Sequence, residues 1–285
     1  MRLLFLLLLL LPMTALAQEI KLLSWNVYMI PKPILFTKQG IRTSLIIKEL
    51  LKTDHDVVVL QEAFSPVFRM RAYSKLKHKY PYRQLLKRGA GVKFLNSGIF
   101  ILSRYPYKLL STYNYLRCSG IDCFAAKGAL LFEVQHPSGK RLQIVTSHLQ
   151  AETTIAAQTA RAHQFQNIKD MLDKHREVGV PQIMAGDVNV EGRDGNGAEY
   201  LNLLNTLQMT SGPLSGDLDH TADYPVDCYK IISTYKKTLL DHILISENGS
   251  DAQVTHRKVL PFLVKFKYKV CPLSDHYGLE AIIKL

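Results

Sequence analysis

Hydrophobic positions in this chain gather in short runs that end abruptly in polar residues. Six such runs have the length and the β-branched or alternating pattern typical of strands. They are IKLLSWNVYMI from Ile20, DVVVLQE from Asp56, RLQIVTSHLQ from Arg141, PQIMAGDVNV from Pro181, TLLDHILIS from Thr238 and SDHYGLEAIIKL from Ser274. We expect these strands to carry the polar side chains at their ends to one edge of a sheet.

Between the strand-like runs, apolar residues recur at helical spacing. This spacing predicts helices over residues 41–52 and 198–208, and another around Phe165 and Leu172. Ser65-Pro66 predicts the N-cap and first turn of a fourth helix. Further strand runs lie in LNSGIFILSRYP and in DCFAAKGALLFEVQHPSGKRLQIV, with a hairpin over residues 137–139. The mixture predicts an α/β fold of stacked sheets flanked by helices.

The first residues have the pattern of a signal peptide. A single Arg2 precedes an unbroken apolar run from Leu3 to Leu11, and small residues follow up to Ala17. The apolar run is shorter than a membrane span requires, although a retained anchor is an alternative. We therefore expect cleavage after residues 1–17, and a secreted or periplasmic protein. The rest of the chain shows no repeat or linker, so we expect a single catalytic domain over residues 18–285.

The chain is basic. It has 36 Lys and Arg against 24 Asp and Glu. Cleavage of the signal peptide removes Arg2 and no acidic residue, so the formal net charge of the mature chain is 35 − 24, or +11. Such a charge suits an anionic membrane or a nucleic acid, and it is equally ordinary for an exported protein of high isoelectric point.

Four cysteines permit disulfides in an exported chain, although the sequence does not fix their pairing. We favour a short loop closed by Cys118 and Cys123, and a second bond between Cys228 and Cys271, which lie near the candidate site segments.

Eight polar residues directly end or interrupt the apolar runs. They are Asn26, Glu62, His148, Asp187, Asn189, Asp241, Asp275 and His276. A single strand-end Asp or His is usually a turn cap, but a set of this composition is costly to place beside apolar strands unless its members are paired or bind a metal. Oxygen ligands dominate the set and no cysteine pair has zinc spacing, so we expect Mg²⁺ or another divalent cation.

The same set contains the groups that hydrolysis of a phosphodiester needs. Glu62 is the natural metal anchor and Asn26 a group that orients it, while Asp187 and Asn189 could position a water or a phosphate oxygen. The sequence has neither a G-x-S-x-G elbow nor a phosphate-binding G-x-x-x-x-G-K-[ST] loop, which disfavours covalent catalysis. The hypothesis is therefore a metal-assisted attack by water.

Two histidines are available for proton transfer. We expect His276, held in one tautomer by Asp241, to take a proton from water. His148 would then donate a hydrogen bond to the phosphoryl oxygen as its negative charge grows.

Six motifs in order resemble those of the endonuclease/exonuclease/phosphatase superfamily with the deoxyribonuclease I-like fold. They are WNV at Trp25, DVVVLQE ending at Glu62, SHLQA around His148, GDVN from Gly186, LDHILIS around Asp241 and SDH ending at His276. The resemblance implies a four-layered sandwich of two packed mixed β-sheets flanked by helices, with the site at one sheet edge. It also implies the roles given above for Glu62, Asn26, the phosphate-contacting residues and His276. Asp275 would take part in binding the metal or a water.

Other segments resemble the sphingomyelinase branch of that superfamily. They are NSGIFILSRYP from Asn96, DCFAAKGALLFEV from Asp122, Arg161 with Gln164, and Thr221-Ala222-Asp223. We name Lys127 and Asn96 as candidate phosphate-binding residues; for Lys127 an ordinary surface lysine is the alternative.

The branch implies a monomeric Mg²⁺-dependent phospholipase C-type enzyme that cleaves sphingomyelin to ceramide and phosphocholine at a phospholipid membrane surface, without a stable nucleic-acid partner. The alternatives are a secreted nuclease of the same fold and an inactive binding or toxin subunit.

A membrane contact is expected near the C-terminus. The run PFLVKFKYKV from Pro261 predicts one alternating strand, with Lys265, Lys267 and Lys269 on one face and Val264, Phe266 and Tyr268 on the other. The lysine face could lie on lipid headgroups, with Phe262 and Leu263 at a turn that enters the interface. A half-buried strand with a solvated lysine face is the alternative. The bacterial sphingomyelinases carry an aromatic-tipped hairpin between the positions of Asp241 and Asp275, and this chain has no tryptophan there.

Overall fold

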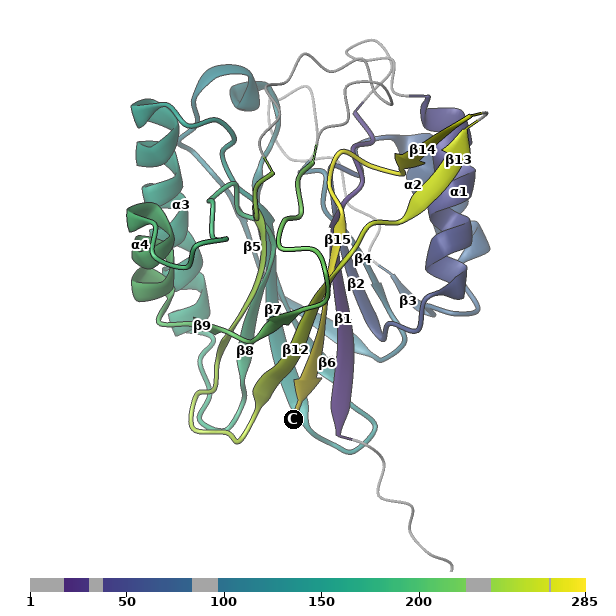
Figure 1. The fold of residues 1–285 in the computed structure, drawn as a ribbon. Helices are drawn as coiled ribbons and strands as arrows, with labels where there is room; N and C mark the ends of the chain where they lie inside the picture. Colours follow the sequence, from purple (N-terminus) through teal and green to yellow (C-terminus); the bar gives the residue numbers. More distant parts are fainter. Residues whose placement is uncertain (1–17, 31–37, 84–96, 224–236, 267) are drawn as a thin grey trace, which may run out of the picture.

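The computed structural model describes residues 18–30, 38–83, 97–223, 237–266 and 268–285. Within these ranges it contains two large β-sheets, a small separate hairpin, four α-helices and one short 3₁₀ helix (Figure 1). The expected signal peptide, Asn96 and Cys228 lie outside the described residues.

Both large sheets are mixed. The first has seven strands in the order β10 (Leu214–Ser215), β12 (Gln253–Leu260), β15 (Gly278–Lys284), β1 (Glu19–Asn26), β2 (Val57–Gln61), β4 (Phe100–Ser103) and β3 (Tyr82–Arg83). The second has six, in the order β5 (Tyr107–Asn114), β6 (Gly128–Gln135), β7 (Arg141–His148), β8 (Gln182–Asp187), β11 (Asp241–Ser246) and β9 (Thr210–Ser211). The six strand runs expected from the sequence are all confirmed, and so is the hairpin that joins β6 to β7.

The helices cover the outer faces of the two sheets. They are α1 (Gln39–Lys52), α2 (Pro66–Lys75), α3 (Ile155–Lys174) and α4 (Ala198–Leu207), with the 3₁₀ helix η1 (Gly120–Phe124) near the start of β6. All four α-helices were expected. The side chain of Ser65 accepts a hydrogen bond from the Phe68 backbone N–H with Pro66 in the first turn, as the Ser-Pro pair predicted.

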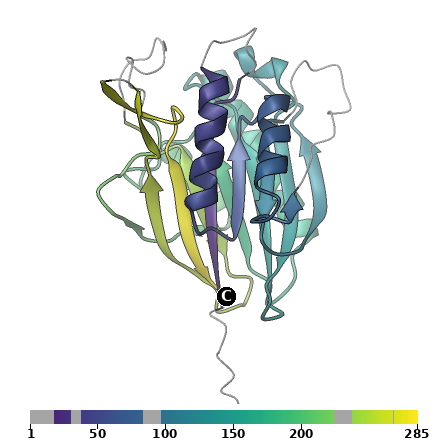
Figure 2. The ribbon, with the colours of Figure 1, turned by 90° about the vertical axis from the view of Figure 1, so that its right-hand side faces the viewer.

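Three hydrophobic clusters hold the layers together. One lies between the sheets and includes Leu22 and Ile183. A second, around Trp25, packs the first sheet against α1 and α2, and the third, around Phe165, packs the second sheet against α3 and α4. The layers are therefore helix, sheet, sheet and helix, which confirms the predicted four-layered sandwich (Figures 1 and 2).

The direction of the strands places the predicted polar residues together. β1 and β2 are parallel, as are β7 and β8, so all four strands finish at the same end of the sandwich, the upper end in Figure 1. β11 and β15 run antiparallel to their neighbours and begin at this end. We call it the polar end of the molecule.

Residues 261–272 differ from the expectation. β13 (Leu263–Phe266) and β14 (Lys269–Pro272) pair with each other in a hairpin outside the large sheets, so the prediction of one alternating strand is wrong. Lys265 pairs with Val270 and Lys269 with Phe266, which puts these two lysines on opposite faces of the hairpin. Lys267 lies outside the described residues. Alternation alone does not reveal a chain reversal when the turn lacks Gly, Pro or Asn.

Phe262 also departs from the prediction, because it does not project from a turn into the surroundings. Its ring packs on that of Trp25, with 4.4 Å between the ring centroids, and its carbonyl accepts a hydrogen bond from the Leu273 backbone N–H. These contacts anchor the base of the β13–β14 hairpin to the first sheet.

The structure contains the expected Cys118–Cys123 disulfide, with 5.3 Å between the two Cα atoms. Cys271 is also disulfide-bonded, and the partner that we expected, Cys228, lies outside the described residues. No helix in the described part of the chain is long and apolar enough to cross a membrane.

Gly186, in β8, allows the close approach of β7. A Cβ atom at Gly186 would lie 2.1 Å from the Ser147 carbonyl oxygen, a backbone atom that cannot move aside without separating the strands. We expect Gly186→Ala to lower the free energy of unfolding by about 1–3 kcal/mol, measured by urea denaturation. Gly40→Ala is the control, because no atom lies within 4 Å of its added Cβ. Equal unfolding free energies for the two variants would contradict the close approach.

Candidate active site

The eight strand-end residues come together at the polar end. His148, Asp187 and Asp241 stand side by side, because His148 pairs with Asp187 across β7 and β8 and Asp187 pairs with Asp241 across β8 and β11. The whole set is buried except for Glu62 and Asn189, which are partly exposed. Residues from both sheets thus form a single polar cluster.

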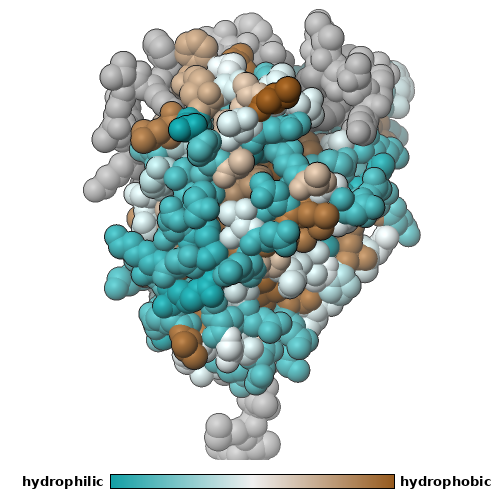
Figure 3. Space-filling view, turned by 90° about the vertical axis from the view of Figure 1, so that its left-hand side faces the viewer, coloured by the Kyte–Doolittle hydropathy of each residue, from teal (hydrophilic) through white to brown (hydrophobic). Residues whose placement is uncertain are grey.

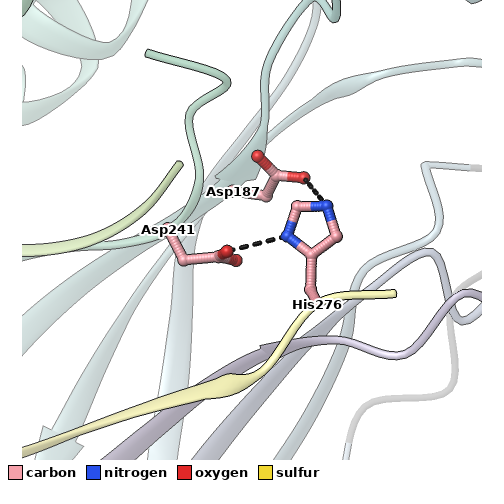
Figure 4. A group of neighbouring side chains, drawn as sticks. All are labelled: Asp187, Asp241 and His276. Atoms are coloured by element: carbon pink, nitrogen blue, oxygen red, sulfur yellow. Dashed lines mark hydrogen bonds and ion pairs between the residues drawn. The ribbon is translucent and has the colours of Figure 1, made fainter. Parts of the chain in front are cut away.

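His276 lies between two aspartates (Figure 4). Its Nδ1 is 2.8 Å from Asp241 Oδ2, and its Nε2 is 3.8 Å from Asp187 Oδ2. Burial alone would lower the pKa of His276, but the charges of Asp241, Asp187 and Asp275 outweigh it and raise this pKa well above the usual 6.5. The Asp241 contact fixes the orientation of the ring, which is the arrangement expected of a histidine that accepts a proton from water.

The backbone around His276 is fixed by long-range contacts. The Trp25 indole N–H donates to the His276 carbonyl at 3.0 Å, and Ser274 Oγ donates to the Asn26 carbonyl at 2.7 Å. The buried guanidinium of Arg42 donates to the carbonyl oxygens of Val27, Tyr28 and Leu273. The loop that carries His276 is thereby tied to the end of β1.

Asn26 links the two sheets at the site. Its Nδ2 donates to Glu62 Oε1 at 3.1 Å and to Asp187 Oδ2 at 3.0 Å, while its Oδ1 accepts from the Tyr28 backbone N–H. The amide therefore orients the carboxylate of Glu62, as the sequence suggested, and its oxygen is already engaged by the backbone.

Glu62 has the surroundings of a cation ligand. Its Oε2 is buried and has no hydrogen-bond partner among the described residues. Burial, together with the nearby charge of Asp275, raises the pKa of Glu62 to about 7. Burial also raises the pKa of Asp275, whose Oδ1 accepts a hydrogen bond from Ser274. Two desolvated carboxylates that repel one another fit a hard divalent cation such as Mg²⁺.

A second group of possible ligand atoms lies in the same cluster. One ligand atom each from Asp187, Asp241 and His276 lies within 4.8 Å of the others. Asp241 in this group is already hydrogen-bonded to His276.

Lys127 is buried beside His148, so its alternative as an ordinary surface lysine is wrong. Its Nζ lies 3.1 Å from His148 Nε2, 2.7 Å from Asp122 Oδ2 and 2.8 Å from the Leu149 carbonyl oxygen. Burial, and then the charge of Lys127, lower the pKa of His148 to about 3. His148 is therefore neutral, and the ammonium of Lys127 supplies positive charge in its place.

Asn189 completes the cluster at the end of β8. Its backbone N–H donates to Asp187 Oδ1 and its Nδ2 donates to the Leu149 carbonyl, both at 3.1 Å. The residue has a positive φ of 53°, a conformation that Asn tolerates better than most residues.

Arg161 and Gln164, on α3, support the loop that follows His148. Arg161 is paired with Glu199 and donates to the carbonyls of Gln150 and Glu152, and Gln164 Oε1 accepts from the Gln150 N–H. They act through the loop rather than on the cluster itself.

Three supporting residues were not identified from the sequence. Asp122 holds Lys127, Thr221 Oγ1 accepts hydrogen bonds from the backbone N–H groups of Leu240 and Asp241, and Arg42 binds the three carbonyls described above. Asp122 and Thr221 lie in segments that resemble the sphingomyelinase branch, but the sequence does not show which groups they bind: Lys127 five residues on for Asp122, and backbone N–H groups 19 and 20 residues on for Thr221. Arg42 stands at an ordinary position in a helix and gave no signal.

The model of the endonuclease/exonuclease/phosphatase family matches residues 23–276 of the chain. A protein named Sphingomyelinase C from Bacillus cereus is 24% identical over 300 residues, which cover 93% of this chain and 89% of that protein. One named Sphingomyelinase C 2 from Leptospira interrogans is 25% identical over 297 residues. That match covers 93% of this chain and 46% of the relative, so the chain spans less than half of that protein's length.

Solved structures share the fold. A beta toxin from Staphylococcus aureus superposes with a TM-score of 0.78 at 23% identity, over 92% of this chain and 99% of that chain. A variant of the same toxin that has bound magnesium ions gives a TM-score of 0.77.

The raised pKa of Glu62 predicts how metal binding depends on pH. The metal-free folded protein holds this proton up to about pH 7, whereas an ordinary Glu loses it near 4.5, so the stability from Glu62 falls as the pH rises through this window. Mg²⁺ competes with the proton and should therefore raise the melting temperature more at about pH 8 than at about pH 5.5, relative to EDTA. Glu62→Gln should remove most of this increment. An increment that is the same at both pH values would contradict the assignment of Glu62.

Proposed function

The chain belongs to the endonuclease/exonuclease/phosphatase family, and we propose that it is a secreted Mg²⁺-dependent phosphodiesterase that hydrolyses sphingomyelin to ceramide and phosphocholine. The main support is a carboxylate oxygen of Glu62 that is buried and has no hydrogen-bond partner in the described part of the chain, in the same cluster as a histidine oriented by Asp241. The relatives named sphingomyelinase C match 93% of the chain and favour this substrate over others of the family.

Each part of the site has a chemical task. In its neutral form, His276, oriented by Asp241, takes a proton from the attacking water as the water oxygen bonds to phosphorus. The bond between phosphorus and the ceramide oxygen breaks, and that oxygen takes up a proton so that ceramide leaves as an alcohol. The ammonium of Lys127 and the side chain of Asn189 would face the growing negative charge on the phosphoryl oxygens, and neutral His148 accepts a hydrogen bond from that ammonium at Nε2. Glu62 and Asp275 would hold the cation, with Asn26 orienting Glu62, and Mg²⁺ would supply charge stabilisation for the phosphate.

The substrate lies in a membrane, and the β13–β14 hairpin is suited to reach it. Its exposed side chains include Leu263, Tyr268 and Val270, and Lys265 and Lys269 add positive charge. Tyr268, next to the turn, is an exposed aromatic residue of this hairpin. An aromatic residue with a polar tip suits the lipid interface.

Secretion is supported by the signal-like residues 1–17 and by the Cys118–Cys123 disulfide, a bond typical of oxidising compartments. We expect the mature chain to act as a monomer. The charge of +11 keeps a secreted nuclease as the second candidate, and an inactive subunit is disfavoured because the cluster is complete.

We expect the mature protein to release phosphocholine from sphingomyelin vesicles in Mg²⁺ and not in EDTA. His276→Ala should lower kcat by about 10²–10⁴-fold, because the proton acceptor is lost. His78 is exposed and follows α2, outside the cluster. His78→Ala is therefore the control and should leave kcat unchanged. Nicking of supercoiled plasmid without lipid cleavage would overturn the substrate and favour the nuclease.

Lys127 should contribute to catalysis as well as to folding. We expect Lys127→Ala to lower kcat by about 10²–10³-fold, because a preorganised positive donor beside His148 is removed. Lys108→Ala changes an exposed lysine on β5 and serves as the matched control. A rise in KM with unchanged kcat would show that Lys127 binds substrate and transition state equally.

A further inference from the structure

The segment between β5 and β6 exposes large apolar side chains at the polar end. The exposed fraction is 85% for Leu116, 70% for Ile121 and 58% for Phe124. Ile155, the first residue of α3, is 83% exposed. We call these four residues the apolar rim. In Figure 3, hydrophobic residues stand at the upper end of the face that carries α3, and hydrophilic residues cover most of the face below.

The two segments of the apolar rim pack against each other. Ser119 and Gln150 exchange two hydrogen bonds, from the Ser119 N–H to Gln150 Oε1 and from Gln150 Nε2 to the Ser119 carbonyl. The Ala151 N–H donates to Asp122 Oδ2 at 2.7 Å. The loop that precedes α3 therefore supports the segment that carries Leu116, Ile121 and Phe124.

The exposure of the rim is a fixed feature of the fold. The Cys118–Cys123 disulfide closes the segment, and the Asp122 carboxylate is held by Lys127 as well as by Ala151. These constraints hold the loop that carries Ile121. Exposed apolar side chains that gather on a rigid surface mark an interaction site.

The apolar rim is connected directly to the active site. Asp122, between Ile121 and Phe124, binds the ammonium of Lys127, which in turn lies 3.1 Å from His148. The β13–β14 hairpin lies at the same end of the molecule, on the opposite side of the sandwich (Figures 1 and 2). It also exposes apolar side chains, including Tyr268. The active site is thus flanked by two apolar projections.

We propose that the apolar rim is a second membrane-contacting surface, which enters the interfacial region of a lipid bilayer while the β13–β14 hairpin enters it on the other side of the active site. Two separate projections at one end of a rigid molecule fit a flat, apolar partner. Arg117, beside Leu116, and the net positive charge suit anionic headgroups. The choice of a bilayer rests on the proposed function, because sphingomyelin is found there.

Vesicle binding tests this surface without any use of catalysis. We would measure cosedimentation of the mature protein with phosphatidylcholine vesicles containing an anionic lipid, in EDTA and without sphingomyelin. The triple variant Leu116→Ser, Ile121→Ser and Ile155→Ser should bind on the order of 100-fold more weakly, if each side chain is about half buried in the interface. Val178→Ser, at the opposite end of α3 and also exposed, should bind as the parent protein does. Unchanged binding by the triple variant would overturn the proposal.

A second variant tests the proposal independently, even if the triple variant fails to fold. Trp25 is the only tryptophan of the chain and is fully buried, so Ile121→Trp adds one exposed reporter. On vesicles its emission should shift to shorter wavelength and be quenched by lipids brominated along their acyl chains. Emission that stays as in water, in a protein that does bind, would place the rim away from the membrane and overturn the proposal.

The outcomes also separate this proposal from the proposed function. Vesicle binding that depends on the rim, in a protein that does not cleave sphingomyelin, would retain the surface and reject the substrate. A parent protein that is dimeric by analytical ultracentrifugation, with a monomeric triple variant, would instead assign the rim to a second copy of the chain and overturn the bilayer contact.

Discussion

Four carboxylates are crowded into the space where the two sheets meet at the polar end, and the rest of the structure depends on this arrangement. Asp187, Asp241 and Asp275 are buried and Glu62 nearly so. Removing such groups from water costs free energy, and the raised pKa values of Glu62 and Asp275 express that cost. The compensating groups come from separate parts of the chain: the amide of Asn26, the imidazole of His276 and the ammonium of Lys127. A divalent cation at Glu62 would complete this balance, so metal binding and stability are linked through the same residues.

Such a cluster requires a frame that does not relax. The His276 loop is tied to β1 by the Trp25 indole and by Arg42, a fully buried cation that binds three carbonyls. Trp25 also carries the Phe262 ring, so one aromatic side chain joins the active site to the base of the β13–β14 hairpin. On the other side, Asp122 joins His148 through Lys127 to the disulfide-closed segment. Two short chains of contacts therefore connect the active site to the surface. One runs through Trp25 to the β13–β14 hairpin, and the other runs through Lys127 and Asp122 to the disulfide-closed segment.

The sequence predicted those features that depend on local pattern. Asn26 and Asp187 could be identified because each ends an apolar run, and parallel strands bring such ends together. Asp122 could not be identified in the same way, since it does not end an apolar run and its partner Lys127 is placed beside His148 by the pairing of the sheet. The hairpin at 263–272 was predicted wrongly, because its alternation continues through the turn residues. Arg42 lies in a helix whose pattern gives no sign that its side chain reaches the carbonyls at the end of β1.

The placement of positive charge bears on the class of substrate. A protein that tracks nucleic acid needs exposed cations along the path of the phosphates. Around this site, the basic side chains of Lys127, Arg42 and Arg161 are buried and bound to partners within the protein. The surfaces that project beside the site carry exposed apolar side chains among their charges, at Leu116 and Ile121 on one side and at Tyr268 on the other. Among the described residues, buried cations that are already bound within the protein, together with exposed apolar side chains beside the site, favour a phosphodiester presented at a membrane over one in an extended polyanion.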